Sequence, residues 1–206
     1  MEPTIYVVDD DDGVRGALAA LLTHKGLRVA AYASGKDFLA AYHTERPGCL
    51  LLDLRIPDMD GLAIQQELAS HDVRLPIVFM SAHGTVRDSV QAMKGGAVDF
   101  LEKPFSREAL LTAIQQALAV DQRMRVRREQ HADVATRYHR LSDRERDILK
   151  LIVGGKSGKD IAKILGISPR TVDHHRFSLM AKMQASSLAE LGAIAAEFPP
   201  PPGKEV

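Results

Sequence analysis

The sequence predicts two domains, an α/β domain with a five-stranded, parallel, doubly wound sheet and a C-terminal all-α domain of four helices. Over residues 1–120, short apolar runs alternate with amphipathic helical segments, which is typical of a parallel sheet with helices on both faces. From Leu141 onward the helical period continues without strands. Charge divides in the same way, because residues 1–120 hold 11 basic and 16 acidic side chains and residues 121–206 hold 16 and 11.

The composition, 45% hydrophobic and 26% charged over 206 residues, is that of an ordinary globular protein. No apolar run approaches the ~20 residues that a membrane-spanning helix needs. The N-terminal MEPTIYVV lacks the features of a secretory signal, so we expect a cytoplasmic protein with no membrane partner. The single Cys49 excludes an internal disulfide, and we interpret it as a small apolar residue that starts a buried strand.

Five strands are expected in the first domain, because five short apolar runs are each bounded by turn residues. In chain order they are Ile5–Val8, Leu27–Tyr32, Leu50–Leu52, Pro76–Met80 and Ala97–Leu101. The Leu50–Leu52 run is apolar throughout and indicates a strand buried on both faces, as in a parallel sheet.

Five helices are expected between and after these strands, because apolar residues there recur every three or four positions. The expected helices are one capped by Asp12, one capped by Ser34, Gly61–Ser70, Thr85–Lys94 and one capped by Ser106. Their apolar positions are Val14, Leu18, Leu21 and Leu22; Phe38, Leu39 and Tyr42; Ile64 and Leu68; Val86, Val90 and Met93; and Leu110, Ile114 and Leu118.

Polar residues follow four of the strands at their carboxyl ends, which is where ligands bind in open α/β sheets. They are Asp9, Asp10, Asp53, Ser81 and Lys103. Three carboxylates in one place repel one another unless a cation is present, and Mg²⁺ is the hard cation that such oxygens prefer. With a lysine and a hydroxyl donor beside them, the set predicts a phosphoryl acceptor site in which Asp53 attacks in line.

Each of these residues also has an ordinary structural interpretation. A run of acids usually begins a solvated helix, and this is how we interpret Asp11 and Asp12. A serine at a strand end usually forms a turn, and a lysine before proline usually lies in a loop. Their joint occurrence at four strand ends favours the functional interpretation.

Residues 3–120 resemble a receiver domain of the two-component response regulators, which has a flavodoxin-like fold. The residues that carry the resemblance are Asp9-Asp10, Asp53 in LLLDLRIPDMDG, Ser81 in MSAHG, Phe100 after GAVD, and Lys103-Pro104 in EKPF. The resemblance implies that Asp53 accepts phosphate from the phosphohistidine of a sensor histidine kinase. It also implies that Mg²⁺ is bound directly by Asp10, Asp53 and the Arg55 carbonyl, and by Asp9 through water.

Further roles come from the same resemblance. Lys103 would pair with the phosphoryl group, Ser81 and Phe100 would form a switch pair, and the peptide bond before Pro104 would be cis. Arg55 and His83 occupy variable positions beside the site. Our hypothesis is that Arg55 hinders the water that hydrolyses the aspartyl phosphate.

Residues 121–140 are charged and contain neither proline nor glycine. This stretch contains six arginines, at positions 123, 125, 127, 128, 137 and 140. We interpret it as a solvent-exposed helical linker that continues the preceding helix and acts as a spacer. The alternative is a helix that dimerises or contacts phosphates.

The second domain has the pattern of a helix-turn-helix within a four-helix unit. Ser142 caps the first helix, which ends at Gly154-Gly155, and the second covers about Ser157–Leu165. A Gly166-Ile167-Ser168 turn leads to the third, Pro169–Met183, with proline at its first position. The fourth contains Leu188, Leu191 and Ile194.

The outward face of the third helix carries the candidate DNA contacts Arg170, Thr171, His174 and Lys182, with the further candidate Arg176 at its margin. Arginine reads guanine edges, and both arginine and lysine neutralise phosphates. An exposed helix with ordinary polar residues is the alternative interpretation, but the turn chemistry favours DNA binding.

Leu141–Glu197 resembles the LuxR-type helix-turn-helix of the FixJ/NarL regulators. LSDRERDIL, IAKILGISPRTV and His175-Arg176 before Met183 carry the resemblance. Gly158 stands where asparagine is usual, and Asp173 stands where many relatives have lysine. An acidic side chain there repels phosphate and could instead accept a hydrogen bond from cytosine.

The whole sequence thus resembles a transcriptional response regulator rather than an enzyme. We expect a receiver at 1–120, the linker at 121–140, the DNA-binding domain at 141–198 and a disordered tail at 199–206. Phosphorylation would drive homodimerisation, binding to promoter DNA and contact with RNA polymerase. A metal-dependent phosphohydrolase is a competing reading, but it needs an acid or base where Arg55 stands. The second competing interpretation is a protein-interaction module that has lost DNA binding, and the acidic Asp173 motivates it.

Overall fold

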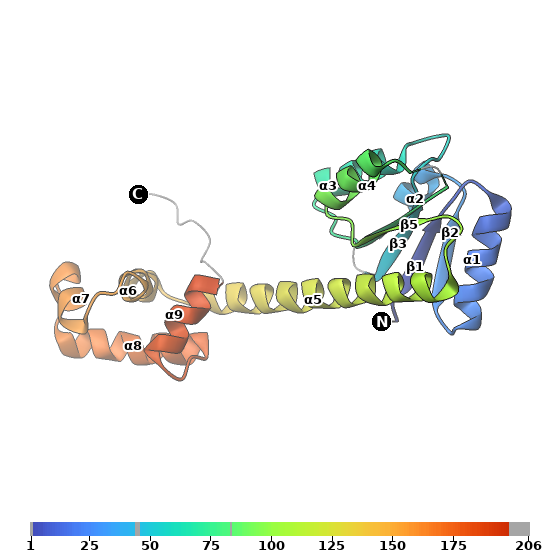
Figure 1. Cartoon of the computed structure of the whole chain (residues 1–206). Helices are drawn as coiled ribbons and strands as arrows, with labels where there is room; N and C mark the ends of the chain where they lie inside the picture. Colours follow the sequence, from blue (N-terminus) through green and yellow to red (C-terminus); the bar gives the residue numbers. More distant parts are fainter. Residues whose placement is uncertain (1, 44–45, 83, 198–206) are drawn as a thin grey trace. The chain divides into compact units, whose positions relative to one another are not determined.

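The structure is a computed structural model that describes residues 2–43, 46–82 and 84–197 (Figure 1). The expectations for His83 and for the tail at 199–206 lie outside the described residues. The chain divides into two compact units, Met1–Arg125 and Val126–Val206, and each is described by itself. Among the described helices, none is both long and apolar enough to cross a bilayer.

Five parallel strands form a single sheet in the first unit, in the order β2-β1-β3-β4-β5. The strands are β1 Thr4–Val8, β2 Arg28–Tyr32, β3 Gly48–Asp53, β4 Ile77–Ser81 and β5 Asp99–Glu102. The helices are α1 Asp12–His24, α2 Gly35–Ala41, α3 Gly61–Ser70, α4 Val86–Lys94 and α5 Arg107–His139. This confirms the predicted fold class, with strand ends shifted by one or two residues.

Two apolar cores lie on the two faces of the sheet. Alternate residues of β3 point to opposite faces, so Leu50 and Leu52 belong to one core and Leu51 to the other. Helices α2, α3 and α4 cover the first core, and α1 and α5 cover the second (Figure 1). Cys49 is fully buried in the second core, as expected, and burial together with the charge of Asp121 raises the pKa of its thiol to about 12.

The N-cap of α1 is Asp11, so the prediction of Asp12 was wrong by one residue. Asp11 has an extended backbone, and its side chain accepts hydrogen bonds from the Gly13 and Val14 amides at 2.8 and 3.0 Å. Asp12 lies in the first helical turn and pairs with Arg15. An acid in either place is favoured by the helix dipole, which is why the sequence alone did not separate them.

The apolar stripe of α4 faces solvent in this unit rather than the sheet. Val86, Val90 and Met93 are 81%, 46% and 48% exposed, and Ala92 is the buried residue of this helix. The helical spacing identified the stripe correctly, but the spacing carries no information on whether another surface covers it. This exposed apolar surface on α4 enters the proposals below.

Helix α5 continues to His139, so nearly all of the stretch at 121–140 is helical, as predicted. Its expected exposure is wrong at two positions, because Asp121 and Tyr138 are buried. The Asp121 carboxylate accepts from the Gly48 amide at 3.0 Å and from Arg125 Nε at 2.8 Å. A buried carboxylate with two donors holds this part of α5 to the first residue of β3.

The second unit contains the C-terminal end of α5 and four further helices, α6 Asp143–Val153, α7 Gly158–Leu165, α8 Pro169–Met183 and α9 Leu188–Glu197. Gly166 between α7 and α8 has φ +64°, a left-handed conformation that glycine adopts without strain. Ser168 caps α8 by accepting from the Thr171 amide, with Pro169 at the first position. Val172, Leu179 and Met183 face the core, which confirms the predicted helix-turn-helix pattern.

Candidate phosphoacceptor site and helix-turn-helix

The sequence-predicted acids and the lysine meet at the carboxyl edge of the sheet. Asp53 is the last residue of β3, Asp9 directly follows β1, and Lys103 directly follows β5. The Lys103 ammonium donates to Asp9 Oδ2 at 2.7 Å and to Asp53 Oδ2 at 2.5 Å. Lys103 is 94 positions from Asp9 and 50 positions from Asp53 in the chain, yet the three side chains form one charged cluster.

The three side chains of this cluster, Asp9, Asp53 and Lys103, are largely buried. The Asp9 side chain is fully buried, whereas Asp10 beside it is exposed. Burial raises the pKa of Asp9, and the hydrogen bond and charge of Lys103 act against that rise. Burial alone would lower the pKa of Lys103, but its bonds to Asp53 and Asp9 outweigh burial and raise it. We therefore take Lys103 to be protonated, because two carboxylates share its charge.

The acids also fit a metal ion. One oxygen each of Asp9, Asp10 and Asp53 can be chosen so that all lie within 4.8 Å of one another. The exposed Asp10 leaves this group open to solvent, and an all-carboxylate donor set suits a hard divalent cation. Lys103 engages Oδ2 of Asp53, while Oδ1 accepts from the Arg55 amide at 3.0 Å. The chemistry of the donor set therefore agrees with the expectation of a cation site.

Ser81 and Phe100 lie on the neighbouring strands β4 and β5. Ser81 is almost fully buried, and its carbonyl accepts from the Lys103 amide at 2.8 Å. The Phe100 ring is partly buried and stacks on Phe79. Gly84 passes against both expected switch residues, because a Cβ at Gly84 would lie 2.6 Å from Phe100 Cζ and 3.2 Å from Ser81 Cβ. This close approach of Gly84 was not predicted from the sequence, although the MSAHG motif contains the residue.

Arg55 connects the loop after β3 to the start of α4. Its guanidinium donates to Asp60 at 2.7 Å and contacts Asp88 at 3.3 Å. Asp88 also completes the capping box of α4 by accepting from the Thr85 amide and hydroxyl. Arg55 was expected beside the site, but its ion pair with Asp88 could not be predicted, since no local pattern relates residues 55 and 88.

On α8, the predicted DNA contacts fall into two groups. Arg170, Thr171 and His174 are exposed, and Arg176 is partly buried beside the start of α7. A Cβ at Gly158 would come within 2.9 Å of Arg176 Nη1, so the glycine found in place of asparagine leaves room for this guanidinium.

Lys182 has a different environment from the other predicted contacts. Its ammonium donates to both carboxylate oxygens of buried Glu145, at 2.9 and 2.7 Å. Burial would raise the pKa of Glu145, but hydrogen bonds from Lys182, Ser178 and Ser142 outweigh it and lower the pKa to about 2. The charge of Lys182 is therefore committed inside the domain, which argues against the predicted phosphate contact.

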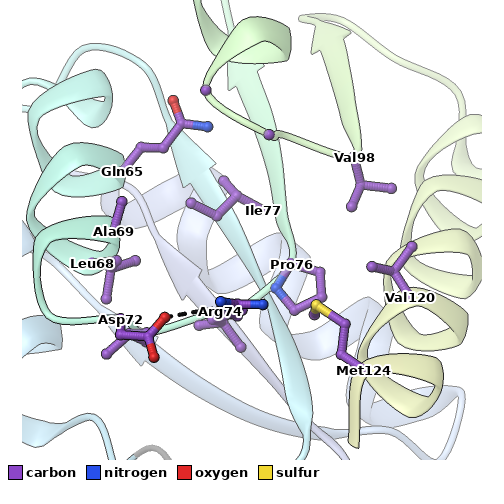
Figure 2. A pocket seen from close by; sticks show the side chains of 14 residues that line it. Gln65, Leu68, Ala69, Asp72, Arg74, Pro76, Ile77, Val98, Val120 and Met124 are labelled. Atoms are coloured by element: carbon purple, nitrogen blue, oxygen red, sulfur yellow. Dashed lines mark hydrogen bonds and ion pairs between the residues drawn. The ribbon is translucent and has the colours of Figure 1, made fainter. Parts of the chain in front are cut away.

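A separate hollow of about 290 Å³ lies at the opposite edge of the sheet, beside the amino end of β4 (Figure 2). Helix α3, the turn between α4 and β5, and α5 surround it, and Leu68, Ile77 and Met124 are among its mostly apolar walls. Asp72 and Arg74 are its charged lining residues, and they pair with each other at 3.2 Å. None of the acidic cluster lines this hollow, so the two features are distinct.

Two family models match the chain and define its class. Residues 5–115 match the response regulator receiver domain, and residues 139–195 match the bacterial regulatory proteins of the luxR family. The fold and the site at the sheet edge thus define the class of the protein, a regulator that joins these two domains.

Relatives match both domains together. The chain is 41% identical over 190 residues to the response regulator protein TmoT of Ectopseudomonas mendocina, covering 92% of this chain and 86% of TmoT. It is 41% identical over 188 residues to the transcriptional regulatory protein FixJ of Rhizobium meliloti (strain 1021), covering 91% and 92%. The solved structure of the response regulator StyR matches with a TM-score of 0.84 and 39% identity, covering 96% of this chain and 100% of that chain.

The chain therefore belongs to the two-component response regulators, among the transcriptional regulators that join a receiver domain to a LuxR-type helix-turn-helix domain. This confirms the predicted family, fold and function class, and it assigns the chain to regulators rather than enzymes.

Proposed function

We propose that Asp53 accepts a phosphoryl group from a phosphohistidine of a sensor histidine kinase. The observation that carries this proposal is the Lys103 ammonium, which donates to Asp9 and Asp53 at once. An amine held there can stabilise negative charge on an incoming phosphoryl group as it does on the carboxylates. A carboxylate oxygen of Asp53 attacks phosphorus in line, the O–P bond forms as the N–P bond breaks, and the imidazole nitrogen keeps the bonding electrons.

The cation that we propose for the acidic cluster is Mg²⁺. The Asp10 and Asp53 carboxylates and the Arg55 carbonyl would hold it directly, and Asp9 would do so through water. Bound there, it would supply positive charge beside the transferring group. Lys103 supplies the second positive charge and keeps the Asp53 carboxylate in place.

Phosphotransfer is tested with purified protein, acetyl phosphate as donor and MgCl₂, followed by intact-protein mass spectrometry. The expected result is one hydroxylamine-labile phosphoryl group on the wild type and none on Asp53→Asn. Asp12→Asn is the matched control, because Asp12 is an exposed acid near the same sheet edge. Retention of the phosphoryl group in Asp53→Asn would refute the assignment of the acceptor.

We further propose that Ser81 and Phe100 transmit phosphorylation to the face formed by α4, β5 and α5. The exposed apolar surface on α4, made of Val86, Val90 and Met93, supports a homodimer on this face, because a partner would remove it from water. Gel filtration of beryllofluoride-treated protein tests this step. We expect a dimer, and a strictly monomeric active form would contradict it.

The helix-turn-helix is proposed to bind double-stranded promoter DNA, with Arg170, Thr171, His174 and Arg176 as the contacts. The exposure of the first three supports this set, whereas Lys182 is engaged by Glu145. Two such units in a dimer would bind paired half-sites, in the cytoplasm and within reach of RNA polymerase. We keep 1–120, 121–140 and 141–198 as the functional divisions of the chain.

Salt dependence separates DNA binding from a purely protein-binding role, which the acidic Asp173 on α8 would otherwise favour. Contacts to phosphates release counterions, so the affinity for DNA falls steeply as salt rises. We expect this fall in fluorescence anisotropy titrations with labelled duplex DNA. An activated dimer whose only binding is insensitive to salt would support the alternative.

A further inference from the structure

The exposed face of α8 has an unusual centre for a surface that is proposed to meet DNA. The side chain of Asp173 is 74% exposed, and the whole residue Phe177 is 73% exposed. They are four residues apart on one helix, so their side chains are neighbours on the same face. An acid and an aromatic ring, rather than two basic groups, therefore stand side by side on this face.

Phe177 is the aromatic member of the large apolar side chains that the described residues expose. The core of this domain is filled from the opposite side of α8, by Val172, Leu179 and Met183. The Phe177 ring therefore adds little to folding and leaves a large apolar surface in water. Contact with an apolar group of a partner would remove that surface from water.

The Asp173 carboxylate is also available to a partner. Its ion pair with Arg176 Nη1 has a length of 3.9 Å, which is longer than a hydrogen bond. Its oxygens are thus acceptors without a close donor in the described part of the chain. A carboxylate so exposed repels phosphates, so a useful contact with DNA must come from a donor on a base edge.

The major groove offers the matching groups on pyrimidines. Cytosine presents its N4 amine as a donor, and thymine presents its C5 methyl group. Four residues advance a helix by about 6 Å along its axis, and successive bases of one DNA strand are spaced by about 3.4 Å along the duplex axis. Two side chains with this separation can therefore reach bases one or two steps apart.

We propose that Asp173 and Phe177 are the specificity-determining pair of α8 and select pyrimidines in each half-site. Asp173 accepts from the N4 amine of cytosine, and the Phe177 ring packs on the C5 methyl of thymine. The proposal rests on the DNA-binding function proposed above and adds which bases the domain prefers. Arg170 and Arg176 remain available for phosphates or guanine.

Selection from a randomised duplex library tests the proposal, using beryllofluoride-treated full-length protein. The wild type is expected to enrich a cytosine and a thymine one or two steps apart in each half-site. Phe177→Ala is expected to lose the thymine preference alone. Asp173→Ala, which removes both acceptor oxygens, is expected to lose the cytosine preference alone. Val153→Ala, which trims an exposed apolar side chain on α6, is the matched control and is expected to keep both preferences.

A second measurement isolates the methyl group. Replacing the selected thymine by uracil removes only C5 methyl, and we expect affinity of the wild type to fall roughly fourfold, as for one buried methyl group. Phe177→Ala should bind both duplexes equally. An unchanged thymine preference and an unchanged uracil effect in Phe177→Ala would overturn the pair while leaving DNA binding intact. Absence of any salt-dependent DNA binding by the wild type would overturn both proposals.

Discussion

The buried Glu145 network makes the stability of the helix-turn-helix domain dependent on pH. Glu145 is 3% exposed, and Lys182, Ser178 and the Ser142 amide all donate to it. These bonds lower its pKa from the ordinary 4.5 to about 2. Because each pKa unit is worth about 1.4 kcal/mol, the ionised form should contribute about 3 kcal/mol to the free energy of unfolding.

The pH window follows from the direction of the shift. When the pKa of a carboxyl group is lower in the folded state than in the unfolded state, a fall in pH protonates the unfolded state first and so favours unfolding. The contribution of Glu145 is therefore complete above about pH 4.5 and is lost as the pH falls toward about 2. Glu145→Gln, a neutral isostere, should remove the contribution at pH 7 and change little at the acid end of the window.

Hydrogen–deuterium exchange of the full-length protein, read over α6 and α8, measures this effect at each pH. At pH 7, we expect Glu145→Gln to lower the protection factors by roughly two orders of magnitude, because about 3 kcal/mol corresponds to a factor of that size. The strands of the receiver serve as an internal reference. Asp143→Asn is the control, because Asp143 lies in the first turn of the same helix with its side chain 96% exposed, and little change is expected. Equal losses for both variants, or the same loss at pH 7 and pH 3, would refute the reasoning.

Three further predictions concern the receiver. Lys103→Gln leaves buried Asp9 and Asp53 without their shared cation, so thermal unfolding without divalent cations should show a loss of about 3 kcal/mol in the free energy of unfolding. MgCl₂ should raise the melting temperature more in this variant than in the wild type. An equal response of both proteins to MgCl₂ would argue against a shared site. Arg55→Ala should shorten the lifetime of the acyl phosphate, because the guanidinium hinders the attacking water in our hypothesis, and an unchanged rate of phosphate release would remove that role. Val90→Ser places a hydroxyl on the exposed apolar surface of α4 and should weaken the beryllofluoride-induced dimer in sedimentation experiments, whereas undiminished dimerisation would exclude this residue from the interface.

The sequence was sufficient for the fold and for the cluster because both depend on local patterns. Apolar runs located each strand, and the parallel arrangement then required Asp9, Asp53 and Lys103 to share an edge. The helix from Pro169 to Met183 was predicted with its bounds, since proline and a capping serine mark its start.

Contacts between distant segments could not be predicted in this way. Arg55 with Asp88, Asp121 with Gly48, and Lys182 with Glu145 each join residues at least 33 positions apart. Exposure of the apolar stripe on α4 was likewise unpredictable, because helical spacing defines a face but not what covers it. Lys182 was assigned to DNA from its charge alone, and its buried partner became visible only in three dimensions.

Phosphorylation of Asp53 is proposed to control the binding of DNA by the helix-turn-helix domain. The most direct test is an anisotropy titration of labelled promoter-derived duplex with wild type and Asp53→Asn, each with and without acetyl phosphate and MgCl₂. We predict that the donor strengthens binding by the wild type and leaves Asp53→Asn unchanged. Equal affinity of the wild type with and without the donor, despite a phosphoryl group detected by mass spectrometry, would contradict the claim.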